Sequence, residues 1–115
     1  MISKPVFLQG IYGFDGSGID KPATLHPDLT YTVPAGITTQ PLYFRGGNAT
    51  DELITVVLVR DGVPMRYFPI GARASTHVAL AVVEDLEDGT ALELQLAARA
   101  GLAGTVVVDL GLVEV

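Results

Sequence analysis

Apolar and polar residues alternate in several short segments of the chain, and Gly and Pro residues separate these segments. The clearest case is residues 91–96, where leucines at every second position alternate with Glu93 and Gln95. A period of two places the leucines on one face of a strand and the polar side chains on the other. No segment keeps the 3.6-residue apolar period of a helix. The pattern therefore predicts β-strands with little or no helix.

The segments predicted as strands number seven or eight. They are residues 30–33, 38–44, 53–59, 63–70, 76–83, 91–96 and 106–113, with a further short piece at residues 6–8. Before residue 29, glycines and prolines leave room only for short extended pieces. Residues 45–48 are predicted as a turn, and Asp61-Gly62 and Asp88-Gly89 as hairpin turns. Strands spaced by about 8–12 residues are typical of a sandwich or barrel. We therefore predict one all-β domain over residues 1–115, an antiparallel, jelly-roll-like β-sandwich.

Two predicted strands, residues 53–59 and 106–113, are apolar on both faces. In the second of these, the even-numbered residues from Val106 to Leu112 lie on one face, while Val107 and Val113 lie on the other. The chain then stays apolar up to Val115, although chain ends are usually polar unless they are tied down. One sandwich core covers only one face of a strand, so these strands predict a second covering layer. A second copy of the chain is the expected cover, in a closed symmetric homo-oligomer.

Two aromatic pairs lie beside arginines, in Tyr43-Phe44-Arg45 and Arg66-Tyr67-Phe68. If both segments are strands, one ring of each pair faces outward. Outward aromatic residues beside arginine are favoured at interfaces. The candidate interface residues are therefore Tyr43, Phe44, Tyr67, Val107, Val113 and Val115.

Composition strengthens the expectation of self-association and excludes several partners. Hydrophobic residues make up 49% of the chain and charged residues 17%, against about 25% charged residues in ordinary soluble domains. The net charge of −6 disfavours nucleic acid and anionic membrane surfaces. The absence of cysteine excludes disulfides and thiolate metal sites. The first residues lack the pattern of a secretory signal and no apolar run reaches about 18 residues, so we expect a cytoplasmic protein.

Few residues are candidates for chemistry. His26 lies in a predicted loop and His77 at the start of a predicted strand, and the loop near residue 15 offers oxygen ligands such as Asp15 and Asp20. His77, Asp15 and Asp20 are the candidate metal ligands, since carboxylates and imidazole bind divalent ions. The alternative, which we favour, is that His26 lies in a surface loop, that His77 has a structural role, and that the loop near residue 15 binds no ion. No serine lies in a nucleophile motif, so we assign no catalytic residue and no cofactor.

Four segments carry a resemblance to known proteins: VFLQGIYG (residues 6–13), YFRGGN (43–48), MRYFPIGA (65–72) and VVVDLGLVEV (106–115). They resemble a family of short bacterial proteins of about this length, some of which carry the label molybdopterin oxidoreductase. Enzymes of that class are large and enclose a bulky cofactor, whereas this chain has no cysteine ligand for one. The strand pattern also resembles jelly rolls of the tumour-necrosis-factor and C1q type. These are trimers, and the resemblance implies a homotrimer.

Three functions are compatible with the sequence. The leading one is a non-enzymatic, homo-oligomeric structural or accessory protein. The alternative is a module that binds a small molecule or a metal ion through His77, Asp15 and Asp20. The third is an enzyme or enzyme accessory subunit whose site forms between subunits.

Overall fold

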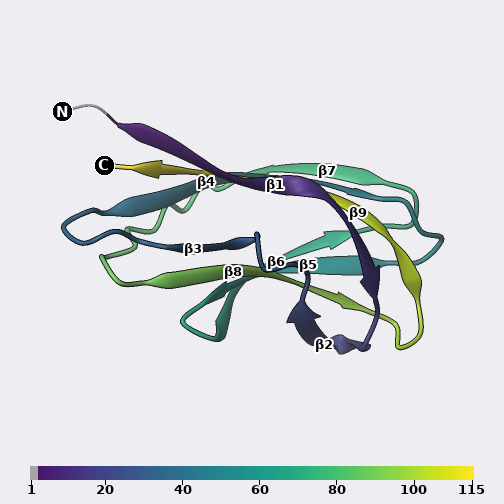
Figure 1. The fold of residues 1–115 in the computed structure, drawn as a ribbon. Helices are drawn as coiled ribbons and strands as arrows, with labels where there is room; N and C mark the ends of the chain where they lie inside the picture. The colour runs from purple at the N-terminus through teal and green to yellow at the C-terminus, as the bar shows by residue number, and fades with distance from the viewer. Residues whose placement is uncertain (1–2) are drawn as a thin grey trace.

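The computed structural model describes residues 3–115, which form two antiparallel sheets packed face to face (Figure 1). The first sheet has the strand order β1-β9-β4-β7, with β1 at Lys4–Asp15, β9 at Ala103–Glu114, β4 at Thr39–Asn48 and β7 at Ser75–Ala79. The second has the order β2-β8-β5-β6, with β2 at Gly18–Thr24, β8 at Ala91–Ala98, β5 at Ile54–Arg60 and β6 at Val63–Ile70. A short strand, β3 at Thr30–Thr32, also pairs with β8. The predicted antiparallel β-sandwich is confirmed, with nine strands among the described residues. The described residues include no helix that is long and apolar enough to cross a membrane.

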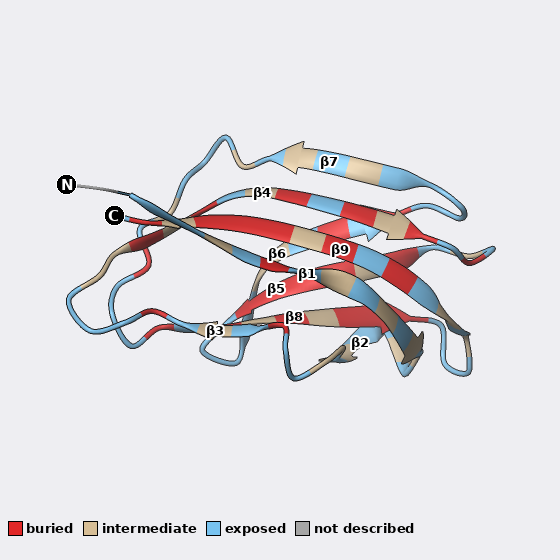
Figure 2. Cartoon of the chain, turned by 45° about the horizontal axis from the view of Figure 1, so that its top comes forward, coloured by how far each residue is buried: buried red, intermediate tan, exposed pale blue. Residues whose placement is uncertain are grey.

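The core lies between the two sheets and follows the predicted alternation. Along β9, the inward residues Val106, Val108, Leu110 and Leu112 are buried, and Figure 2 shows the resulting alternation along β4 and β9. Phe44 stacks on Phe68 across the core, with ring centroids 4.3 Å apart. Each predicted aromatic pair therefore sends one ring inward and leaves Tyr43 or Tyr67 on the outer surface.

The turn between β5 and β6 has the predicted hairpin geometry. Asp61 has a φ of 49° and Gly62 a φ of 80°, and positive φ at both central residues defines a type I′ turn. Its right-handed twist matches that of the flanking strands, which pair from Arg60–Val63 back to Ile54–Ile70.

Two predictions at glycine-rich segments are wrong: that only short extended pieces precede residue 29, and that residues 45–48 form a turn. β1 is twelve residues long and pairs with β9 along its whole length, although it contains Gly10 and Gly13. Residues 45–48 continue β4 and form no turn, because β9 pairs with them on one side and β7 pairs with residues 45–47 on the other. Gly46 is needed there for packing, since a Cβ would lie 2.7 Å from Cδ1 of Ile70. Pairing with neighbouring strands outweighs the weak strand propensity of glycine.

Asp88-Gly89 forms a turn but no hairpin. Gly89 has the expected positive φ of 78°, and its N–H donates to the carbonyl of Val33 at 2.9 Å. The strands on either side, β7 and β8, belong to different sheets. Turn residues determine the local backbone conformation but not the pairing partner of the strand that follows.

The outer face of β5 is already covered within one chain, which removes one reason for expecting a second copy. Val57 and Val59 point away from the core cluster, yet both are almost inaccessible. Val57 is paired with Gln95 on one side and Tyr67 on the other, and directly opposed residues share a face. These two long side chains therefore lie on either side of the valine on the outer face.

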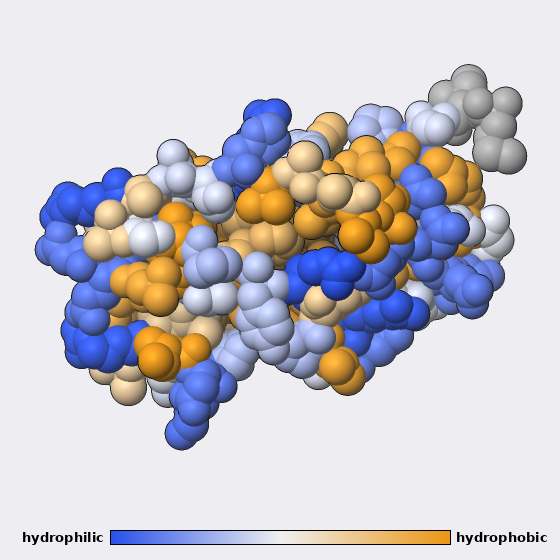
Figure 3. Space-filling model, turned by 180° about the vertical axis from the view of Figure 1, so that it is seen from behind, coloured by the Kyte–Doolittle hydropathy of each residue, from blue (hydrophilic) through white to orange (hydrophobic). Residues whose placement is uncertain are grey.

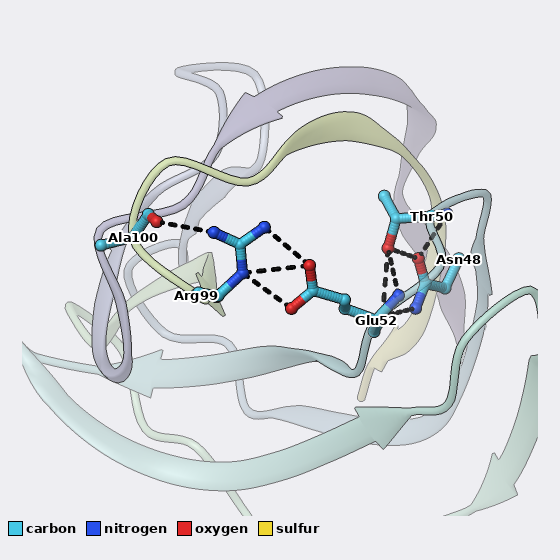
Figure 4. A network of polar contacts seen from close by, with 5 residues as sticks. All are labelled: Asn48, Thr50, Glu52, Arg99 and Ala100. Carbon is cyan, nitrogen blue, oxygen red and sulfur yellow. Dashed lines mark hydrogen bonds and ion pairs between the residues drawn. The ribbon is translucent and has the colours of Figure 1, made fainter.

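A polar network ties the β4–β5 connection to the connection after β8 (Figure 4). The buried Asn48 amide donates to the carbonyls of Glu52 at 2.7 Å and Gly71 at 3.0 Å, and its oxygen accepts from the Thr50 hydroxyl at 2.7 Å. Both carboxylate oxygens of Glu52 accept bonds from Arg99, the shortest at 2.7 Å from Nη2 to Oε2. These bonds lower the pKa of Glu52. The network fixes the loops at one end of the sandwich.

Candidate functional site

Four polar side chains form one row across the outer surface of the first sheet. Gln9 on β1 is paired with Asp109 on β9, Asp109 with Arg45 on β4, and Arg45 with His77 on β7. Paired residues in an antiparallel sheet point to the same side. Phe44, Val108 and Leu110 are buried in the core, so the row points away from it. A single strand sequence cannot reveal this row, because its members come from four strands.

We call the surface around this row the β9 face. On one side of the row lie the paired residues Phe7, Gly111, Tyr43 and Ala79, and on the other Ile11, Val107, Gly47 and Ser75. Phe7, Ile11 and Val107 are exposed. The β9 face therefore combines a central hydrogen-bonding row with apolar and aromatic groups on both sides.

Tyr43 is held in place by two neighbours. Its ring lies on Gly111, where a Cβ would overlap the ring, and its hydroxyl donates to Oδ1 of Asp109 at 3.1 Å. Burial raises the pKa of Tyr43, and the hydrogen bond to Asp109 raises it further. The hydroxyl therefore remains a donor at neutral pH, and Oδ2 of Asp109 can accept a hydrogen bond from a ligand.

Arg45 and His77 both lie beside the Tyr43 ring. The guanidinium carbon of Arg45 lies 5.0 Å from the Tyr43 ring centroid, a distance at which a cation is attracted to the ring. The His77 ring meets Tyr43 edge-on, at 6.1 Å and 88°. An aromatic ring, a cation, an imidazole and a carboxylate thus come together from three strands.

A hollow of about 550 Å³ lies beside this cluster. It is lined by Arg45, Gly46, Gly47, Ser75, Thr76, His77, Val107 and Asp109. Gly47 leaves its floor open, since it has no side chain to fill the space between Val107 and Ser75, its partners on the neighbouring strands. A second hollow, of about 480 Å³, shares Val107 and Asp109 and extends to Gln9 and Ile11 on β1. The two hollows together cross the sheet from β7 to β1.

The candidate metal ligands lie on different elements. His77 lies on β7 of the first sheet, Asp20 on β2 of the second, and Asp15 at the end of β1. Residues 3–115 contain no group of three or more His, Asp or Glu side chains placed to hold a metal ion. His26 lies in the loop after β2, where its Nδ1 accepts the Asp28 N–H at 3.1 Å and its ring lies 4.7 Å from the Tyr12 ring.

The candidate interface residues do not lie on one surface. Tyr43 and Val107 lie on the β9 face, where Val113 is half-buried, and Val115 is exposed after the end of β9. Tyr67 is exposed on the outer surface of the second sheet. Phe44 is a correction, because it is fully buried in the core and cannot contact a partner.

Sequence reasoning missed Gln9, Arg45 and Asp109 as site residues. One signal was available for Asp109, the only polar residue in the apolar run from residue 106 to 113 apart from Gly111. An isolated carboxylate on the outer side of such a strand needs a hydrogen-bond partner or solvent. Here the partner is the Tyr43 hydroxyl, which donates to Asp109.

A second polar cluster lies near the C-terminal end of β9 and contributes to the fold. The Tyr31 hydroxyl donates to Oε2 of Glu114 at 2.6 Å and lies 2.9 Å from the Thr39 hydroxyl. Burial is the main cause that raises the pKa of Tyr31, followed by the bond to Glu114. Thr39 and Glu114 are buried, so this cluster offers no surface to a ligand.

Known proteins resemble the chain in structure. The CBM36-1 domain of a multidomain xylanase from the hindgut metagenome of Trinervitermes trinervoides is similar over 96% of each chain, with a TM-score of 0.58 and 15% identity. A carbohydrate-binding module CBM36 in complex with calcium and xylotriose is similar over 94% of this chain and 97% of its own, with a TM-score of 0.59 and 19% identity. No protein-family model and no curated protein matches the sequence. The chain shares the jelly-roll β-sandwich fold of these modules.

Proposed function

We propose that the chain is a non-catalytic module that binds a saccharide on its β9 face. The observation that carries the proposal is the cross-strand row of Gln9, Asp109, Arg45 and His77 beside the Tyr43 ring and the hollow of about 550 Å³. The proposal is supported by the shared fold with modules whose names describe carbohydrate binding, one of them in complex with xylotriose.

The chemistry of the β9 face suits a sugar. A pyranose ring has hydroxyl groups that both donate and accept hydrogen bonds, together with apolar C–H surfaces. Asp109 and Gln9 offer acceptors, and Arg45, Gln9 and His77 offer donors. Tyr43, Val107 and Ile11 offer apolar or aromatic surface beside them. Four strands at a spacing of about 4.8 Å give a row long enough for more than one sugar ring.

The proposed binding needs no metal ion. The neighbour with xylotriose also holds calcium, and calcium takes six to eight oxygen ligands, several of them from carboxylates. The described part of the chain gathers no group of three acidic or histidine side chains that suits such an ion. We therefore expect a chelator to leave saccharide binding unchanged.

Calorimetric titration with xylotriose, cellotriose and xylotriose carrying one glucuronic acid branch tests the proposal. Tyr43→Ala removes the ring from the β9 face, and we expect it to weaken binding roughly tenfold or more, equivalent to about 1.4 kcal/mol. Tyr67→Ala is the matched control, because it removes an exposed tyrosine from the other sheet. Far-ultraviolet circular dichroism checks that both variants are folded. The proposal is wrong if none of the three saccharides binds, or if the two variants weaken binding equally.

Self-association is a second candidate function, favoured by exposed apolar side chains. Phe7, Ile11 and Val107 are exposed on the neighbouring strands β1 and β9. Figure 3 shows that hydrophobic residues also gather in groups on the surface seen from behind. A second copy seated on the β9 face would cover Phe7, Ile11 and Val107, and it would compete with a saccharide for the same residues.

A further inference from the structure

Arg45 differs from the other arginines in its charged neighbours. Arg60 and Arg66 pair with Glu84, Arg73 pairs with Asp51, and Arg99 pairs with Glu52. Within residues 3–115, Arg45 makes no ion pair. The protein carries 13 acidic residues against 7 lysines and arginines, so acidic partners are abundant. An arginine without one, on the wall of the largest hollow described above, is available for an anionic group of a ligand.

Arg45 lies between the hollow, which it lines, and the Tyr43 ring. It lies in the middle of β4, where β9 pairs on one side and β7 on the other. Its guanidinium stays close to the Tyr43 ring, which limits the positions of the long side chain. Gly47, the next outward residue on β4, has no side chain to fill the adjacent space. Ser75 and His77 line the same hollow and provide further polar groups there.

The charges on the β9 face favour a group with one negative charge. Arg45 presents a planar fork of donors that matches a carboxylate in a bidentate arrangement. Asp109, its partner on β9, carries a negative charge that repels a doubly charged group such as a phosphate. Asp109 accepts a hydrogen bond from Tyr43, and the ion pairs among the described residues do not include one between Asp109 and Arg45. We propose that the saccharide carries a carboxylate, as in a uronic acid, and that Arg45 binds it; this inference rests on the proposed function.

The experiment compares two ligands that differ by one acidic group. Xylotriose carrying one glucuronic acid branch and plain xylotriose are titrated against the full chain by calorimetry at pH 7 and low salt. We expect the acidic ligand to bind roughly 10- to 100-fold more tightly, the range that hydrogen bonds to a charged group provide. Added salt weakens only the binding of the acidic ligand, because salt screens exposed charges.

Arg45 variants identify the residue responsible. We expect Arg45→Gln to remove the preference for the acidic ligand: binding of the acidic ligand falls to the level of plain xylotriose, whose own binding also weakens because Arg45 is one of the donors of the proposed site. Arg45→Lys keeps the charge but loses the planar fork, so it retains only part of the preference. Arg60→Gln is the matched control, since it makes the same change in charge on the second sheet and leaves the preference intact. Arg45 is exposed, and a melting curve verifies that its variants are folded.

The outcomes separate this inference from the proposed function. If both ligands bind with equal affinity, or if Arg45→Gln keeps the preference, the inference is wrong and saccharide binding stands. If the xylotriose-based ligands and cellotriose all fail to bind, both are wrong. A preference that disappears in Arg45→Gln but not in Arg60→Gln supports both.

Discussion

Two glycines on the β9 face, Gly111 and Gly47, have different neighbours. A Cβ at Gly111 would overlap the Tyr43 ring, whereas a Cβ at Gly47 would meet the Val107 Cβ at an ordinary distance of 3.6 Å. Neither residue has a positive φ, so an alanine at either position adopts the backbone conformation without strain. The first glycine makes room for a side chain of the protein, and the second leaves the floor of the hollow open.

The substitutions Gly111→Ala and Gly47→Ala therefore have separable effects. We expect Gly111→Ala to displace the Tyr43 ring and lower the free energy of unfolding by about 1–3 kcal/mol, as overpacking does. Gly47→Ala keeps or slightly raises stability, because alanine is favoured over glycine in a strand by roughly 0.5–1 kcal/mol. Its methyl group occupies the floor of the hollow and weakens saccharide binding roughly tenfold. Urea unfolding and calorimetric titration measure the two effects. Equal binding by Gly47→Ala and the parent chain would show that the ligand lies elsewhere.

At the level of elements, the alternation of side chains predicted the strands well and their partners poorly. β8 and β9 follow the predicted periods, and the even-numbered residues of β9 from Val106 to Leu112 lie in the core as expected. β1 and the end of β4 escaped prediction, because their glycines resemble turns until β9 pairs with them. The β9 face could not be predicted either, because its row depends on the strand order β1-β9-β4-β7. Only pairing between residues far apart in the sequence determines that order.

The hairpin between β5 and β6 gives a prediction that belongs to this scale. Gly62 has a φ of 80°, and no atom lies within 4 Å of a Cβ built on it. The cost of Gly62→Val is therefore conformational, since a left-handed backbone costs a residue with a Cβ about 1–2 kcal/mol, and we expect that loss in the free energy of unfolding. Gly71→Ala is the control, because its φ is not positive and its Cβ would meet Ala74 at 3.9 Å. Equal melting temperatures for Gly62→Val and the parent chain would contradict the type I′ assignment.

Across the whole molecule, the two strands predicted to be apolar on both faces, β5 and β9, differ in how far one chain covers their outer side chains. On the second sheet, Val57 and Val59 are already buried. On the first sheet, Val107 is 46% exposed and Ile11 is 70% exposed, and these two residues are direct partners on β9 and β1. Ile11 also lies on an edge strand, which presents unpaired backbone groups to a neighbouring chain. The low share of charged residues, 17%, does little to offset this exposure.

We therefore expect self-association through the β9 face. Light scattering at micromolar concentration should report a multiple of 12.1 kDa. An interface of standard size buries about 800 Å² per partner. Ile11→Asp should reduce the mass to that of one chain, because it would place an unpaired charge in an apolar contact. Ile19→Asp is the matched control: Ile19 is 71% exposed but lies on β2, at the second sheet. Because the same face is proposed to bind a saccharide, saturating acidic ligand should also lower the mass. A parent chain with the mass of one copy, or equal effects of the two aspartate variants, would exclude this face as the interface between copies.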